Sequence, residues 1–170
     1  MVHIETDGYV ERSVAQVFAY ATDYRRMPEW VFGITTVEPV GEPDHGPGAS
    51  FQGAVDLGPK TLSSTAQITG WEQDRLVTLE SVSGFPFAVT LTLTPVAADK
   101  THLNFELTFA TSGGVAGKAF SRTLEPLLAL AARATTTKLC NACQRATMPG
   151  TAAHDITETI GSERSDPTAT

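Results

Sequence analysis

The sequence contains no stretch of about 18 consecutive apolar residues, which is the length that a membrane-spanning helix needs. Its first residues, Met1 to Glu5, lack the basic and apolar regions of a secretory signal. Basic residues are few: 12 Lys and Arg stand against 19 Asp and Glu, and they form no run that could follow a phosphate backbone. We therefore expect a cytoplasmic protein that neither spans a membrane nor binds nucleic acid.

Cysteine is also scarce, and the only two, Cys140 and Cys143, form a C-x-x-C late in a predicted helix. A zinc site needs four ligands, and the four histidines are scattered over strands, a loop and the tail. A redox pair is favoured at the positive amino end of a helix, whereas this pair lies near the negative carboxyl end. We expect reduced cysteines, no metal and no cofactor.

The common catalytic motifs are missing. The sequence has no G-x-S-x-G, no H-E-x-x-H and no dinucleotide-binding fingerprint. Residues 112–119 match a phosphate-binding loop only in part, because its first glycine and its final Ser or Thr are absent. Motifs therefore identify no catalytic residue, and whether the protein catalyses a reaction is left open.

The composition that remains is that of an ordinary globular domain, with 170 residues, 41% of them hydrophobic and 18% charged. From residue 149 onward the only large apolar side chains are Ile156 and Ile160, which are too few to offset the entropy lost on ordering. We predict one domain over residues 1–148 and a disordered acidic tail over residues 149–170.

Hydrophobic periodicity predicts the order of elements. Residues 2–10 alternate as in a strand, and the Ser13 and Gln16 pair forms a capping box that begins a helix. Residues 34–111 have period two and are cut by turn residues into six strands, whereas residues 115–147 read as one long helix. Pro126 should bend that helix or begin a second one. The predicted fold class is α+β, with a curved antiparallel sheet of about seven strands and a long C-terminal helix.

The strand faces that point inward carry no ionisable residue, which disfavours acid–base catalysis there and favours an apolar cavity. Small residues such as Gly53 and Thr135 leave volume between sheet and helix; a solid core is the alternative. Weak catalytic candidates are Glu80 and Tyr24. The predicted cavity residues are Trp30, Phe51, Ser64, Ala66, Phe87, Val89, Leu91, Phe105, Leu107, Phe109, Leu124 and Leu128.

Several short motifs lie within or next to the predicted elements. They are Val14-x-x-Val17-Phe18 followed by Asp23, Pro28 and Trp30, then Gly46-Pro47-Gly48, Ile68-Thr69-Gly70-Trp71-Glu72 and Leu124-Glu125-Pro126-Leu127-Leu128. In these motifs the chain resembles the polyketide cyclase/dehydrase branch of the START-related (SRPBCC) superfamily over about residues 1–148. The resemblance implies the helix-grip fold, in which an antiparallel sheet curves round the long helix and encloses an apolar cavity.

Three functions stay open at this point. The first is binding of a small hydrophobic, ring-containing molecule in the cavity between the sheet and the C-terminal helix. The second is a polyketide cyclase or dehydratase acting in the same cavity, and the third is a surface interaction module without a ligand. The sequence does not give the ligand or the oligomeric state.

Overall fold

A computed structural model describes residues 1–110 and 115–146 of the chain. The predicted tail, residues 149–170, and the predicted end of the sheet at Gly113 and Gly114 lie outside the described residues. Seven strands form one antiparallel sheet in the order β1-β7-β6-β5-β4-β3-β2. The strands are β1 (Val2–Val10), β2 (Ile34–Pro39), β3 (Ser50–Asp56), β4 (Thr61–Glu72), β5 (Leu76–Gly84), β6 (Phe87–Ala97) and β7 (Lys100–Phe109).

The helices are α1 (Val14–Thr22), the 3-10 turn η1 (Tyr24–Arg26), α2 (Met27–Trp30) and α3 (Val115–Arg145). The predicted capping box begins α1: the Gln16 N–H donates to Ser13 Oγ at 3.4 Å, and the Ser13 N–H donates to Gln16 Oε1 at 3.3 Å. The long C-terminal helix is confirmed, and it continues through Pro126 as a single helix. None of the helices in this part of the chain has both the length and the hydropathy that a membrane crossing requires.

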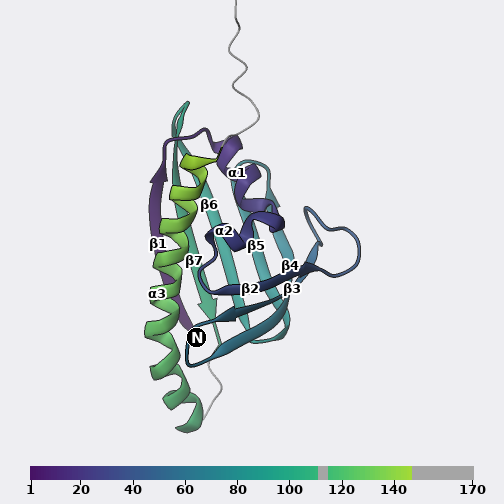
Figure 1. The fold of residues 1–170 in the computed structure, drawn as a ribbon, viewed down its shortest axis with the longest axis vertical. Coiled ribbons are helices and arrows are strands. Elements are labelled where there is room, and N and C mark those ends of the chain that lie inside the picture. The colour runs from purple at the N-terminus through teal and green to yellow at the C-terminus, as the bar shows by residue number, and fades with distance from the viewer. Residues whose placement is uncertain (111–114, 147–170) are drawn as a thin grey trace, which may run out of the picture.

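Irregular pairing curves the sheet. The register shifts between β4 and β5 at two places, Thr65/Ala66 and Ile68/Gly70, and between β2 and β3 once, at Ile34/Thr36. Such bulges bend a strand and increase its twist. Figure 1 shows the result: β2 and β3 cross in front of the sheet, whereas β1, β6 and β7 run along the length of the molecule.

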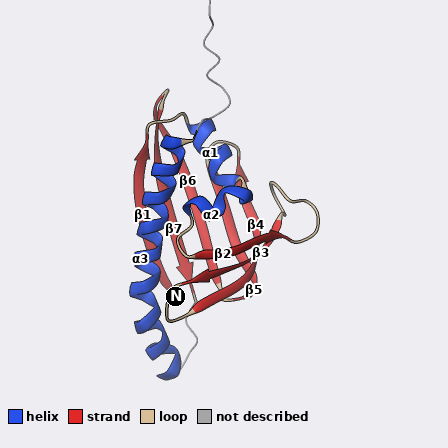
Figure 2. Cartoon of the chain, viewed as in Figure 1, coloured by secondary structure: helices blue, strands red, loops and turns tan. Residues whose placement is uncertain are grey.

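The long helix α3 packs along one side of this curved sheet, next to β1 (Figure 2). Thr6 on β1 and Thr136 on α3 share a hydrogen bond of 2.6 Å between their hydroxyls. A Cβ added to Gly8 would lie 2.8 Å from the Sγ atom of Cys140, so the strand and the helix approach closely there. Because α3 packs mainly on the β1 side, it does not cover the whole concave face of the central strands. Helix α2 lies over that face, and a space remains between α2 and the strands.

The core fills the end of the molecule that α1 covers. Phe18, Leu93, Leu103 and Leu139 are almost completely buried and belong to one continuous hydrophobic cluster. In the pair β6–β7, Leu93 lies opposite Leu103 and Leu91 opposite Phe105, which confirms the inward face predicted for Leu91 and Phe105.

Candidate ligand-binding cavity

A cavity of about 210 Å³ lies between the concave face of the sheet, α2, the β2–β3 pair and α3. Its wall contains all the residues predicted for it except three. Those that line it are Trp30 from α2, Phe51 from β3, Ser64 and Ala66 from β4, Phe87 and Val89 from β6, Phe105 and Leu107 from β7, and Leu128 from α3.

Three predicted cavity residues lie elsewhere. Leu91 lines a smaller neighbouring space of about 60 Å³, which shares Trp30 and Phe105 with the main cavity. Phe109 is buried against Phe85, with their ring centroids 6.0 Å apart. Leu124 is buried in the main core. Their inward parity is correct, but the cavity extends over only part of each element.

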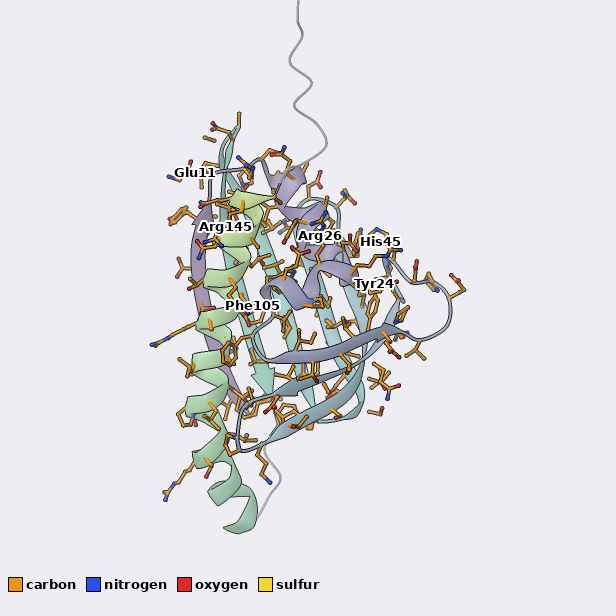
Figure 3. The ribbon with its side chains drawn as sticks, in the orientation of Figure 1. Glu11, Tyr24, Arg26, His45, Phe105 and Arg145 are labelled. Atoms are coloured by element: carbon orange, nitrogen blue, oxygen red, sulfur yellow. The ribbon has the colours of Figure 1, made fainter. Side chains whose placement is uncertain are left out.

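Neither of the weak catalytic candidates belongs to the cavity wall. Glu80 is exposed and pairs with Gln67 and Ala88, while its neighbour Leu79 lines the cavity. Successive strand residues point to opposite faces, so Glu80 faces away from the cavity. Tyr24 packs its ring 5.3 Å from that of Phe51, and Figure 3 shows it on the far side of α2 from α3, away from Phe105.

Sequence reasoning missed the part of the wall that comes between α1 and β3. Its residues are apolar and follow one another closely: Met27, Val31, Phe32, Ile34 and Val37. The sequence does contain a signal for this segment, because the apolar residues Val31 and Phe32 directly follow the four-residue helix α2. The run is too short to show a helical or strand period, so the periodicity analysis did not detect it.

Gly33 positions this segment against the sheet. It has a φ of 73°, which favours glycine, and a Cβ at this position would lie 2.3 Å from the carbonyl oxygen of Asp56. The Asp56 N–H donates to the Gly33 carbonyl at 2.7 Å. This close approach holds the α2–β2 connection, and with it Phe32 and Ile34, at the end of β3.

No charged side chain occurs in the cavity wall among the described residues, and its polar groups are three. The Ser64 hydroxyl donates to the Phe85 carbonyl at 3.0 Å, and Thr135 Oγ1 accepts from the Phe32 N–H at 3.0 Å. Trp30 Nε1 is buried and has no hydrogen-bond partner among the described residues. The arrangement suits a neutral, largely apolar molecule, because a buried unpaired charge is strongly disfavoured.

The two cysteines lie away from this wall, on α3. Burial raises the pKa of the Cys143 thiol to about 12, and the nearby Cys140 adds to the rise. Burial also raises the pKa of Cys140. Both therefore remain protonated thiols near neutral pH, which is the opposite of an activated thiolate.

The model of a protein family described as "Polyketide cyclase / dehydrase and lipid transport" matches residues 1–144, almost the whole of the described chain. The chain belongs to this family. The resemblance seen in the sequence motifs is thereby confirmed. A search of curated proteins found no match.

Solved structures share the fold of this family member at low sequence identity. A protein from Thermus thermophilus has a TM-score of 0.75 at 13% identity, over 86% of this chain and 100% of that one. An aromatase/cyclase, Zhui, from a Streptomyces species has a TM-score of 0.75 at 13% identity, over 85% and 94%. A START superfamily protein from Mycobacterium smegmatis has a TM-score of 0.57 at 17% identity, over 81% and 98%.

These likenesses establish the helix-grip fold, with its curled seven-stranded antiparallel sheet and C-terminal helix. The family description adds a coarse functional statement: it supports a role in binding a hydrophobic ligand or in cyclase chemistry. At these identities the structures carry no ligand or reaction over to this chain.

Proposed function

We propose that this family member binds a small, apolar, ring-containing molecule in the cavity between the sheet and α3. The observation that carries the proposal is the cavity of about 210 Å³ whose described wall has no charged side chain. Ligand sites are concave, mostly apolar and furnished with a few polar groups, and this wall has that character. Phe51, Phe87 and Phe105 supply aromatic faces for a ring to pack against.

The experiment is a titration with N-phenyl-1-naphthylamine, a neutral apolar dye whose fluorescence rises in apolar surroundings. The dye should bind and should raise the melting temperature by several degrees when it is present at about 100 times its dissociation constant. Absence of both effects would refute a hydrophobic-ligand role.

A matched pair of variants locates the binding. Ala66→Phe adds a ring to the cavity wall, where space exists, so dye binding should fall while the protein still folds. Ala88→Phe adds the same ring on the opposite face of the sheet, next to Glu80, and should leave the dye's affinity unchanged. If Ala66→Phe retained full affinity, the dye would be binding elsewhere.

A polyketide cyclase or dehydratase acting in the same cavity is the second candidate, and the family match favours it. Since the described wall offers no titratable group, such a protein would act mainly by folding and orienting a reactive chain. Mass spectrometry of a poly-β-ketone recovered after incubation separates the two functions. A binding protein returns it with its mass and chromatographic retention unchanged, a cyclase that loses no water gives an isomer of the same mass with a different retention, and a dehydratase product is lighter by one water.

A further inference from the structure

Trp30 has a buried hydrogen-bond donor that the described residues leave unused. The residue is 6% exposed, and no acceptor in the described part of the chain reaches its Nε1 atom. Indole N–H groups usually find an acceptor when they are buried, because an unmade buried hydrogen bond costs free energy. Trp30 lines both the main cavity and the smaller neighbouring space. The Nε1 atom itself is closed off from the cavity, so a bound molecule reaches it only after the indole or a neighbouring side chain shifts.

Thr135, on α3, provides a second donor on the helix side of the cavity. Its Oγ1 atom accepts from the Phe32 N–H at 3.0 Å, and its own hydroxyl hydrogen has no acceptor among the residues described. The polar group on the sheet side differs, since the Ser64 hydroxyl hydrogen is already donated to the Phe85 carbonyl. The cavity is thus asymmetric: its unused donors lie on the helices and not on the sheet.

We propose that Trp30, assisted by Thr135, is a specificity-determining residue that selects ligands with a neutral hydrogen-bond acceptor, such as a ketone oxygen. This inference rests on the proposed binding function. The ligand's oxygen faces α2 and α3, and its hydrocarbon rings face Phe51, Phe87 and Phe105. A carboxylate is disfavoured at the same place, because the described wall has no Lys, Arg or His to pair with a buried anion.

Three tricyclic probes of similar shape test this selectivity: fluorene, 9-fluorenone and 9-fluorenone-4-carboxylate. Their dissociation constants can be measured by displacement of N-phenyl-1-naphthylamine. A hydrogen bond between neutral groups should make fluorenone bind about 3- to 10-fold more tightly than fluorene. The carboxylate should bind at least about tenfold more weakly than fluorenone.

The variant Trp30→Phe removes the N–H and keeps an aromatic ring. The ratio of the fluorene to the fluorenone dissociation constant should then fall toward one, even if both affinities change with the smaller ring. Trp71→Phe is the matched control, because Trp71 packs on Phe18 and His45 and does not line the cavity. This control should keep the selectivity of the native protein.

The outcomes separate the two proposals. Equal binding of fluorene and fluorenone by the native protein, or an unchanged ratio in Trp30→Phe, would overturn the role of Trp30 and leave the binding function standing. Tight binding of the carboxylate would overturn the preference for neutral ligands. If neither the dye nor any probe binds, the proposed function fails, and the inference fails with it.

Discussion

The hydroxyl of Tyr20, on α1, donates a hydrogen bond to the carboxylate of Glu29, the residue that precedes Trp30 on α2. Tyr20 is buried, and the Arg26 guanidinium lies 4.9 Å above its ring. Arg26 also lies 3.7 Å from the Glu29 carboxylate, so three side chains join the two helices. Because α2 has only four residues, this cluster acts together with the Phe32 and Gly33 contacts to position Trp30 at the cavity.

Removing the hydroxyl should therefore weaken both stability and binding. We expect Tyr20→Phe to lower the free energy of unfolding by about 1.5 kcal/mol, the low end of the usual range for a hydrogen bond to a charged group, and to weaken dye binding. Urea unfolding and dye titration measure the two effects. Tyr9→Phe is the control, because Tyr9 is 54% exposed, and it should change neither. A Tyr20→Phe variant with native dye affinity would show that α2 is positioned by other contacts.

We expect the protein to lose stability in alkaline solution because of two buried groups, Tyr20 and Cys143. Burial, and then the Glu29 contact, raise the pKa of Tyr20 from 10.0 to about 12, and burial raises that of Cys143 from 9.0 to about 12. Both groups are neutral when protonated, and the folded state holds their protons more tightly than the unfolded state. Their contributions are thus complete below the unfolded pKa values and are lost as the pH rises toward 12.

The window between pH 9 and 10 separates the thiols from Tyr20. There Cys143 and Cys140, whose pKa burial also raises, should each reduce the free energy of unfolding by at most about 1.4 kcal/mol per pH unit. Urea unfolding in the presence of a reductant measures this slope. Cys143→Ala should reduce the slope, and Cys143→Ala combined with Cys140→Ala should flatten it, whereas a slope that persists in the double variant would assign the effect to another group.

Sequence patterns predicted the fold well where a structural feature depends only on residues close together in the sequence. The capping box of Ser13 and Gln16 correctly predicted the start of α1, and alternation correctly predicted which residues of β6 and β7 face inward. The small residues Gly53 and Thr135 indicated missing volume, and both line the cavity. These features depend on neighbours within a few residues or on side-chain size, which the sequence states directly.

The features that the sequence did not predict depend on how the helices and strands pack against one another. The parity of β5 was ambiguous, because both faces of residues 76–82 mix apolar and polar side chains, so Glu80 could not be assigned to the outer face. Leu124 and Leu128 share one helix stripe, yet only Leu128 reaches the cavity, since α3 lies beside β1 and crosses the cavity over a short length. A helix position relative to a sheet is a tertiary property that periodicity does not encode.

The close approach of β1 and α3 predicts an effect of adding a single methyl group. In Gly8→Ala the new Cβ would lie 2.8 Å from Cys140 Sγ, and we expect a loss of about 1–3 kcal/mol from overpacking. Adding Cys140→Ala removes the sulfur and should restore part of that loss. A double-mutant cycle by urea unfolding measures the coupling between the two positions. Additive effects would mean that the new methyl group does not press on Cys140.

The last prediction concerns the hydrogen bond that ties the α2–β2 connection to α3. Thr135 is buried, and its Oγ1 atom accepts from the Phe32 N–H. Thr135→Val keeps the shape of the side chain but leaves that N–H without its acceptor, which should cost about 1–3 kcal/mol. Hydrogen exchange at the Phe32 amide should accelerate more than at the Leu93 amide, which donates to the Arg75 carbonyl in another part of the sheet. Thr135→Ser retains the hydroxyl and should keep the Phe32 amide protected relative to Leu93. Equal acceleration at both amides in Thr135→Val would show only a global loss of stability and would argue against a local role for this hydrogen bond.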